Sequence, residues 1–108
     1  MESSDVVIVL TTLPAGTDAA AFGRTLVEEH LAACVSSSGE IQSVYRWEGS
    51  VTEDAERQVF IKTTAGRVPG LRARLTSLHP YKVPEFIVIP AVDGGADYLA
   101  WVRQSVVT

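Results

Sequence analysis

Apolar and polar residues along the chain alternate in blocks that predict strands and helices in turn. The β-branched run at residues 6–10 is closed by Pro14 and Gly16, a pattern typical of a buried strand and its turn. Thr17 or Asp18 can cap the helix that follows. The apolar side chains on one approximate face of that helix are Ala19, Phe22, Leu26 and Leu31.

The middle of the chain predicts a long β-hairpin. The stretch AACVSSSG leaves the first helix as a second strand, WEGS gives a turn, and RQVFIKTT returns as a third strand. Before the turn, the residues that alternate onto one side are Ile41, Ser43, Tyr45 and Trp47. Seven residues at ~3.3 Å each extend about 23 Å, farther than two helices of a small domain can easily cover. Because exposed edges and large aromatic residues favour pairing, we expect the hairpin tip to dock on a neighbouring copy.

The second half of the chain predicts helix, strand and helix. Apolar residues at helical spacing are Val68, Leu71, Leu75 and Leu78. Pro80 ends this helix, because proline disfavours the α conformation at the preceding residue, His79. Residues 84–92 predict a fourth core strand, and residues 94–106 predict a last helix.

The resulting order is β-α-β-β-α-β with an additional C-terminal helix. This is the α+β, ferredoxin-like plan, with an antiparallel sheet and an extended hairpin between its second and third strands. The chain has no repeat, linker or low-complexity tract, so residues 1–108 are expected to form a single domain.

Composition and charge argue against several partners. The net charge is −4, and no run of Lys or Arg forms a stripe, so neither nucleic acid nor an anionic membrane is expected to bind. The apolar stretches are too short to cross a bilayer, and MESSD does not resemble a signal peptide. The single cysteine, Cys34, cannot form an internal disulfide, which favours a cytoplasmic location.

Cys34 and His79 are the softest potential metal ligands, but neither belongs to a metal-site spacing. Cys34 lies in an apolar passage between helix and strand, where core packing is expected. His79 stands at a helix C-terminus, where the helix dipole favours a cationic imidazole. A structural cap is the simpler interpretation of His79, and metal ligation is the alternative.

Glu85 precedes an apolar run and therefore needs a polar partner. Either Lys62 or Lys82 could supply an ion pair that pins the loop. Alternatively, Tyr81 and Glu85 face a polar cleft. No nucleophile, base and orienting group converge in the sequence, so neither an enzyme nor a required cofactor is expected.

Six motifs occur in order along the chain: TTLP, LVEEHLAACV, VYRWEG, VFIKTT, LHPYKVPEF and YLAWV. Together they resemble the CutA divalent-ion tolerance family over about residues 6–106. The resemblance implies a ferredoxin-like subunit in a tight homotrimer, whose hairpins bridge subunits. It also implies a link to copper and other divalent cations.

The resemblance implies a set of metal ligands, of which this chain keeps only His79. Thr11 stands where the family's proposed metal site has a cysteine, and Leu78 stands where some members have a second histidine. Cys34 matches the family's AAC segment, in keeping with core packing. We therefore expect His79 to hold a divalent cation such as Cu²⁺ only weakly and exchangeably.

Subunit clefts are the expected location of any site. The residues predicted to line them are Tyr45, Trp47, Lys62, Tyr81 and Glu85. The first functional hypothesis is copper and divalent-cation tolerance through weak metal binding without catalysis. The alternative is a small-molecule sensor or signalling trimer, analogous to the nitrogen-regulatory PII proteins that share this subunit plan. A structural scaffold without ligand is the third.

Overall fold

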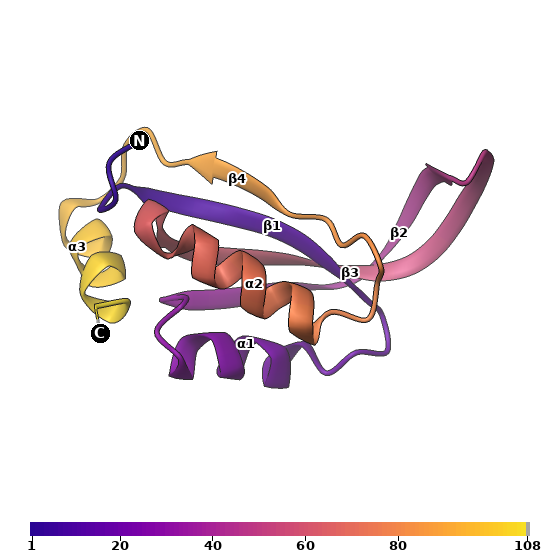
Figure 1. Ribbon diagram of the computed structural model, residues 1–108, viewed down its shortest axis with the longest axis horizontal. Coiled ribbons are helices and arrows are strands. Elements are labelled where there is room, and N and C mark those ends of the chain that lie inside the picture. The colour runs from indigo at the N-terminus through magenta and orange to yellow at the C-terminus, as the bar shows by residue number, and fades with distance from the viewer. Residues whose placement is uncertain (108) are drawn as a thin grey trace.

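Within residues 1–107, which the computed structural model describes, four strands form one antiparallel sheet in the order β2-β3-β1-β4, accompanied by three α-helices (Figure 1). In chain order the elements are β1 (Val6–Pro14), α1 (Ala19–Glu28), β2 (Cys34–Trp47), β3 (Ser50–Thr64), a 3₁₀ turn (Ala65–Arg67), α2 (Val68–Leu78), β4 (Ile87–Pro90) and α3 (Ala96–Ser105). The predicted ferredoxin-like order with its extra C-terminal helix is confirmed.

The core lies between one face of the sheet and the helices α1 and α2. Strand β1 is central, with β3 on one side and β4 on the other, and its Val7 and Val9 are fully buried. The period of two along a strand places Val59 and Ile61 of β3 on the same face. The main apolar cluster consists of Val7, Val9, Leu13, Phe22, Leu26, Ala32, Val59, Ile61, Val68, Leu71 and Leu75.

The helix ends follow from local chemistry. Asp18 caps α1, because its side chain accepts a hydrogen bond from the Ala21 N–H at 3.0 Å. Helix α2 ends at Leu78, and His79 is extended (φ −82°, ψ 136°), as expected of a residue that precedes proline. Both boundaries agree with the sequence prediction.

The β2–β3 hairpin extends beyond the helices and bends away from the body of the molecule (Figure 1). Its turn places Glu48 and Gly49 at positive φ (49° and 82°), the arrangement of a two-residue hairpin loop whose twist matches its strands. An irregularity between Ser37 and Glu40 shifts the register against β3. Such bulges increase the twist and bend of a strand, in keeping with the curvature of the ribbon.

The fourth strand differs from its prediction. β4 covers only four residues at the edge of the sheet, and Ile87 and Ile89 are 50% and 41% exposed, so a core strand over residues 84–92 is wrong. Proline provides a physical reason, because Pro84 and Pro90 cannot donate to a ladder. Cys34 also differs from its prediction, since it is half-buried at the start of β2 rather than packed in the core.

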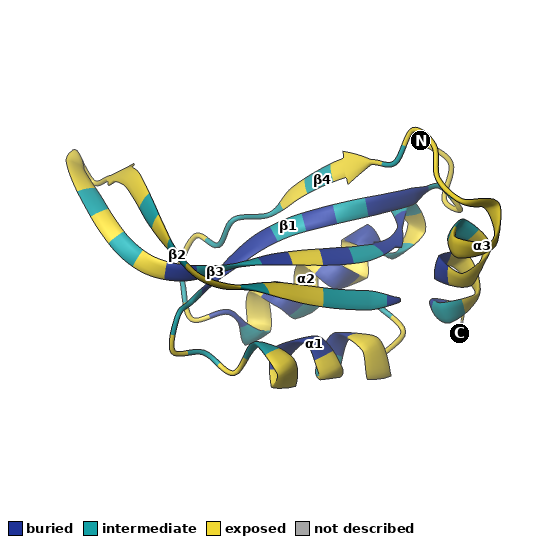
Figure 2. Ribbon diagram, turned by 180° about the vertical axis from the view of Figure 1, so that it is seen from behind, coloured by how far each residue is buried: buried dark blue, intermediate teal, exposed yellow. Residues whose placement is uncertain are grey.

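The sheet face opposite α1 and α2 is largely without a helical cover (Figure 2). Helix α3 lies at one end of the sheet, where Val102 and Val106 pack with Val6 and Ala33. The register of the strands groups a set of apolar side chains on the open face: Ile8, Leu10, Phe60, Ile87 and Ile89. We call this set the open apolar face. In residues 1–107, no helix is long and apolar enough to span a membrane.

Leu75→Ala is expected to lower the free energy of unfolding by about 2–5 kcal/mol, because the fully buried side chain leaves a cavity between α2 and the sheet. Chemical denaturation at fixed protein concentration measures the loss. Val92→Ala is the control, since Val92 is 98% exposed. Equal stability of the two variants would contradict this description of the core.

Candidate functional site

A groove of about 870 Å³ lies between the outer part of the hairpin and the loop that joins α2 to β4. Four of the five predicted cleft residues line it: Tyr45, Trp47, Tyr81 and Glu85. The alternation of β2 brings Tyr45 and Trp47 to the groove, and Pro80 and Pro84 stiffen the loop on its other side. The groove therefore forms within one protomer, where two segments distant in sequence face each other.

Glu56 is the most buried charged group of the groove. It belongs to β3, is only 5% exposed, and accepts a hydrogen bond from the Tyr81 hydroxyl at 2.8 Å. Burial and this carboxylate raise the pKa of Tyr81 far above its usual value. Sequence analysis did not identify Glu56 as a site residue. A usable signal was the alternation of β3, which places this glutamate on the same face of the hairpin as Tyr45 of the paired strand.

Two further hydrogen bonds order the groove. The Tyr45 hydroxyl donates to Asp54 on the facing strand, and this bond raises the pKa of Tyr45. The Gln58 amide donates to the Glu85 carboxylate at 3.0 Å and to the Thr11 carbonyl at 2.8 Å. Glu85 is thus held by a neutral amide, and the predicted ion pair with Lys62 or Lys82 is not formed.

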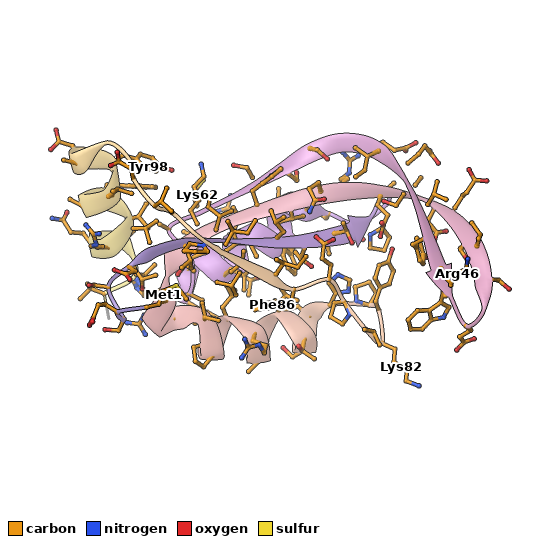
Figure 3. All side chains as sticks on the ribbon, turned by 90° about the horizontal axis from the view of Figure 1, so that it is seen from above. Met1, Arg46, Lys62, Lys82, Phe86 and Tyr98 are labelled. Atoms are coloured by element: carbon orange, nitrogen blue, oxygen red, sulfur yellow. The ribbon has the colours of Figure 1, made fainter. Side chains whose placement is uncertain are left out.

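Lys62 does not reach this groove. It lies beside Tyr98 of α3, toward the opposite end of the sheet from Lys82 (Figure 3). Its ammonium nitrogen is 5.5 Å from the centre of the Tyr98 ring, and the contact with Tyr98 raises the pKa of Lys62. Cys34 is the cross-strand partner of Lys62, so it too lies away from the groove.

His79 is buried, and both of its ring nitrogens are hydrogen-bonded. Nδ1 accepts from the Tyr81 N–H at 3.0 Å, so the ring proton resides on Nε2, which donates to the Thr12 carbonyl at 2.6 Å. The His79 N–H also closes α2 by donating to the Leu75 carbonyl at 2.9 Å. His79 is therefore a structural joint between α2, β1 and the loop.

The residues described, 1–107, contain no group of three or more His, Cys, Asp or Glu that could hold a metal ion. Thr11 is fully buried, and its hydroxyl has no hydrogen-bond partner. A threonine hydroxyl is a poor substitute for a thiolate toward copper or zinc. One protomer thus offers no closed metal site, and a nitrogen of His79 becomes a ligand only by giving up an existing hydrogen bond.

The fold and site define a class of protein: a ferredoxin-like domain with a protruding hairpin and a polar, aromatic groove at its base. The sequence model of the family described as CutA1 divalent ion tolerance protein matches residues 7–105. The chain belongs to this CutA family.

Individual relatives agree with this assignment. The chain is 43% identical to the divalent-cation tolerance protein CutA of Thermus thermophilus, over 91% of this chain and 95% of that protein. It is 37% identical to the protein of that name from Pectobacterium atrosepticum, over 94% and 92%. The crystal structure of CutA from Xylella fastidiosa superposes with a TM-score of 0.90 at 38% identity, covering 94% of this chain and 98% of that one.

Tyr81→Phe is expected to lower stability at neutral pH by about 1–3 kcal/mol, because buried Glu56 loses its donor. Since the pKa of Tyr81 is raised, the folded state holds the phenolic proton more tightly than the unfolded chain. That stability is fully present below about pH 10 and is lost at higher pH, so the variant should show a shallower loss. Denaturation at several pH values tests this, with Tyr98→Phe as control.

Proposed function

We propose that this chain acts in divalent-cation tolerance as a cytoplasmic homotrimer that binds Cu²⁺ weakly and catalyses no reaction. The observation that carries the proposal is that His79 is hydrogen-bonded to Thr12 and Tyr81, two of the residues that line a groove containing three carboxylates and two phenols. Membership of the CutA family supports the tolerance role. In this role the metal ion is bound and released, and it is not a resident cofactor.

The hydrogen bonds of His79 give the reason for weak binding. Its Nδ1 lone pair points at the Tyr81 N–H, so a copper ion must displace that donor before it is bound. A backbone N–H left without a partner costs about 1–3 kcal/mol, which is subtracted from the metal's affinity. Water and at most one nearby carboxylate complete the coordination, because the described residues contain no group of three metal ligands, and the ion therefore exchanges readily.

His79→Ala is expected to abolish the copper-binding heat that calorimetry records on untagged protein, because it removes the nitrogen ligand. His30→Ala is the matched control: His30 is the other histidine, is exposed, and has its Nδ1 3.3 Å from the Ser105 carbonyl. Circular dichroism verifies that both variants are folded. Copper binding by His79→Ala that equals the parent's would refute the proposed ligand.

The homotrimer is supported by surfaces that a lone protomer leaves uncovered. Phe60 on the open apolar face is 39% exposed, Ile87 and Ile89 lie beside it, and Trp47 and Val51 near the hairpin tip are 43% and 65% exposed. Strand β4 also has an unpaired edge. Contiguous apolar surface and free strand edges favour association, and a second copy offers complementary elements of both kinds.

Phe60→Glu is expected to convert the trimer into monomers, because it introduces a charge at the centre of the proposed interface. Native mass spectrometry measures the assembly directly. Val27→Glu is a matched control, since Val27 on α1 has the same 39% exposure but belongs to the opposite layer. A monomeric parent protein at micromolar concentration would contradict the trimer.

A second candidate function is a small-molecule sensor. The observation that favours it is the groove itself, whose 870 Å³ lies within the range of about 300–1,000 Å³ typical of small-molecule sites. Its combination of aromatic rings with a few ordered polar groups is also typical of such sites. A metabolite retained in native mass spectra and displaced on denaturation would support this function over metal binding.

A further inference from the structure

We propose that the groove binds an organic ammonium ion, with the carboxylate of Glu56 as its counter-ion. The inference rests on the second candidate function, the use of the groove as a small-molecule site, and names the chemical class of the ligand. Three observations carry it: the sign of the charge in the groove, the unpaired charge of Glu56, and the aromatic lining.

The charged residues that line the groove are mostly acidic. Glu48, Glu56 and Glu85 contribute carboxylates, and Lys82 contributes an ammonium group. Lys82 is exposed, and its side chain points outward from the loop at the lip of the groove (Figure 3). Glu48 is likewise exposed, at the hairpin turn, whereas Glu56 is buried and Glu85 half-buried. The less exposed charges of the groove are therefore both negative, which favours a cationic ligand over an anionic one.

Glu56 is a nearly buried charge without a cationic partner. Among the described residues, no Lys, Arg or His nitrogen lies within 4 Å of its carboxylate, and Tyr81 is the one side chain that donates to it, at Oε2. Arg57 follows it in sequence, but the strand alternation sends Arg57 to the other face, where it bonds the Ala15 and Ser38 carbonyls. A buried carboxylate is costly unless a cation compensates it, and the groove is the side from which one can arrive.

Three aromatic side chains face the same space: Tyr45, Trp47 and Tyr81. The hydroxyls of both tyrosines donate to carboxylates, which fixes their rings. Aromatic rings attract ammonium groups through their faces, and Trp is the strongest of them. Gln58 adds an acceptor, because its amide nitrogen is committed to Thr11 and Glu85 while its carbonyl oxygen remains available.

An organic cation suits this groove better than a metal ion. A divalent metal needs several ligands at one point, and the described residues contain no such group of three. An ammonium ion needs one strong acceptor and a surface for its carbon atoms. Glu56 with the three rings supplies both, and the volume of the groove accommodates a chain of several carbon atoms.

A matched pair of probes tests the charge requirement: 1,5-diaminopentane and the uncharged 1,5-pentanediol, titrated into the chain of 108 residues in its native assembly. Calorimetry and tryptophan fluorescence follow binding, because Trp47 lines the groove. We expect saturable binding of the diamine, weakened by added salt, and no measurable binding of the diol.

Two matched variants test the counter-ion. Glu56→Gln removes the charge but keeps an acceptor for the Tyr81 hydroxyl, and should weaken diamine binding about tenfold or more. Glu53→Gln removes the same charge from an exposed position of β3 outside the groove and should leave binding unchanged. Thermal unfolding of both variants shows whether a loss of binding reflects a loss of folding.

The outcomes separate this inference from the function on which it rests. Diol that binds as well as diamine, or Glu56→Gln that binds diamine like the parent, overturns the ammonium inference. If the protein retains a neutral or anionic metabolite in native mass spectra and ignores the diamine, the inference fails while the sensor function stands. If neither probe binds and no metabolite is retained, both fail.

Discussion

The rest of the structure depends on one constraint: the β2–β3 hairpin is longer than the two helices beneath the sheet can cover. Over the body of the sheet, α1 and α2 bury one face of β3, and Val59 and Ile61 become core residues. Beyond the helices the same strand has no apolar partner layer, and its side chains satisfy one another through polar bonds across the hairpin and to the loop after α2. The groove forms where the helix-covered part of β3 passes into the part that extends beyond the helices. It is a consequence of the length of the hairpin as much as of any residue that lines it.

The features that sequence analysis predicted well are those decided locally. Pro80 determines the end of α2 through its effect on the preceding residue, and the alternation of β2 determines that Tyr45 and Trp47 share a side. The features it missed depend on which strands meet and in which register. Lys62 was grouped with the groove as a possible ion-pair partner of Glu85. It shares β3 with Glu56 of the groove, yet six residues of extended chain separate the two by about 20 Å. Gln58 was missed as the partner of Glu85 because the two are 27 positions apart, and only the fold brings them together.

The sequence supports two interpretations of His79, a helix cap and a metal ligand, and the structure favours the cap. A histidine before Pro-Tyr is compatible with both a cap and a ligand. The backbone carbonyl of Thr12 and the N–H of Tyr81 then define its tautomer and occupy both nitrogens, and no sequence pattern reveals either bond. The imidazole is first a tie that fastens the loop to β1. A metal would therefore have to compete with these two hydrogen bonds for a nitrogen of His79. A histidine with a free lone pair would impose no such competition.

Tyr81 connects the two proposed sites through different atoms. Its backbone N–H occupies Nδ1 of His79, and its side-chain hydroxyl occupies one oxygen of Glu56. A metal on Nδ1 would break the bond to the Tyr81 N–H, and any accompanying movement of the Tyr81 backbone would disturb the bond from its hydroxyl to the carboxylate. A ligand that held Glu56 and the Tyr81 ring in place would in turn keep the N–H on His79. If metal and ligand binding both occur and act on Tyr81 in these opposite ways, linkage requires each to oppose the other to the same degree.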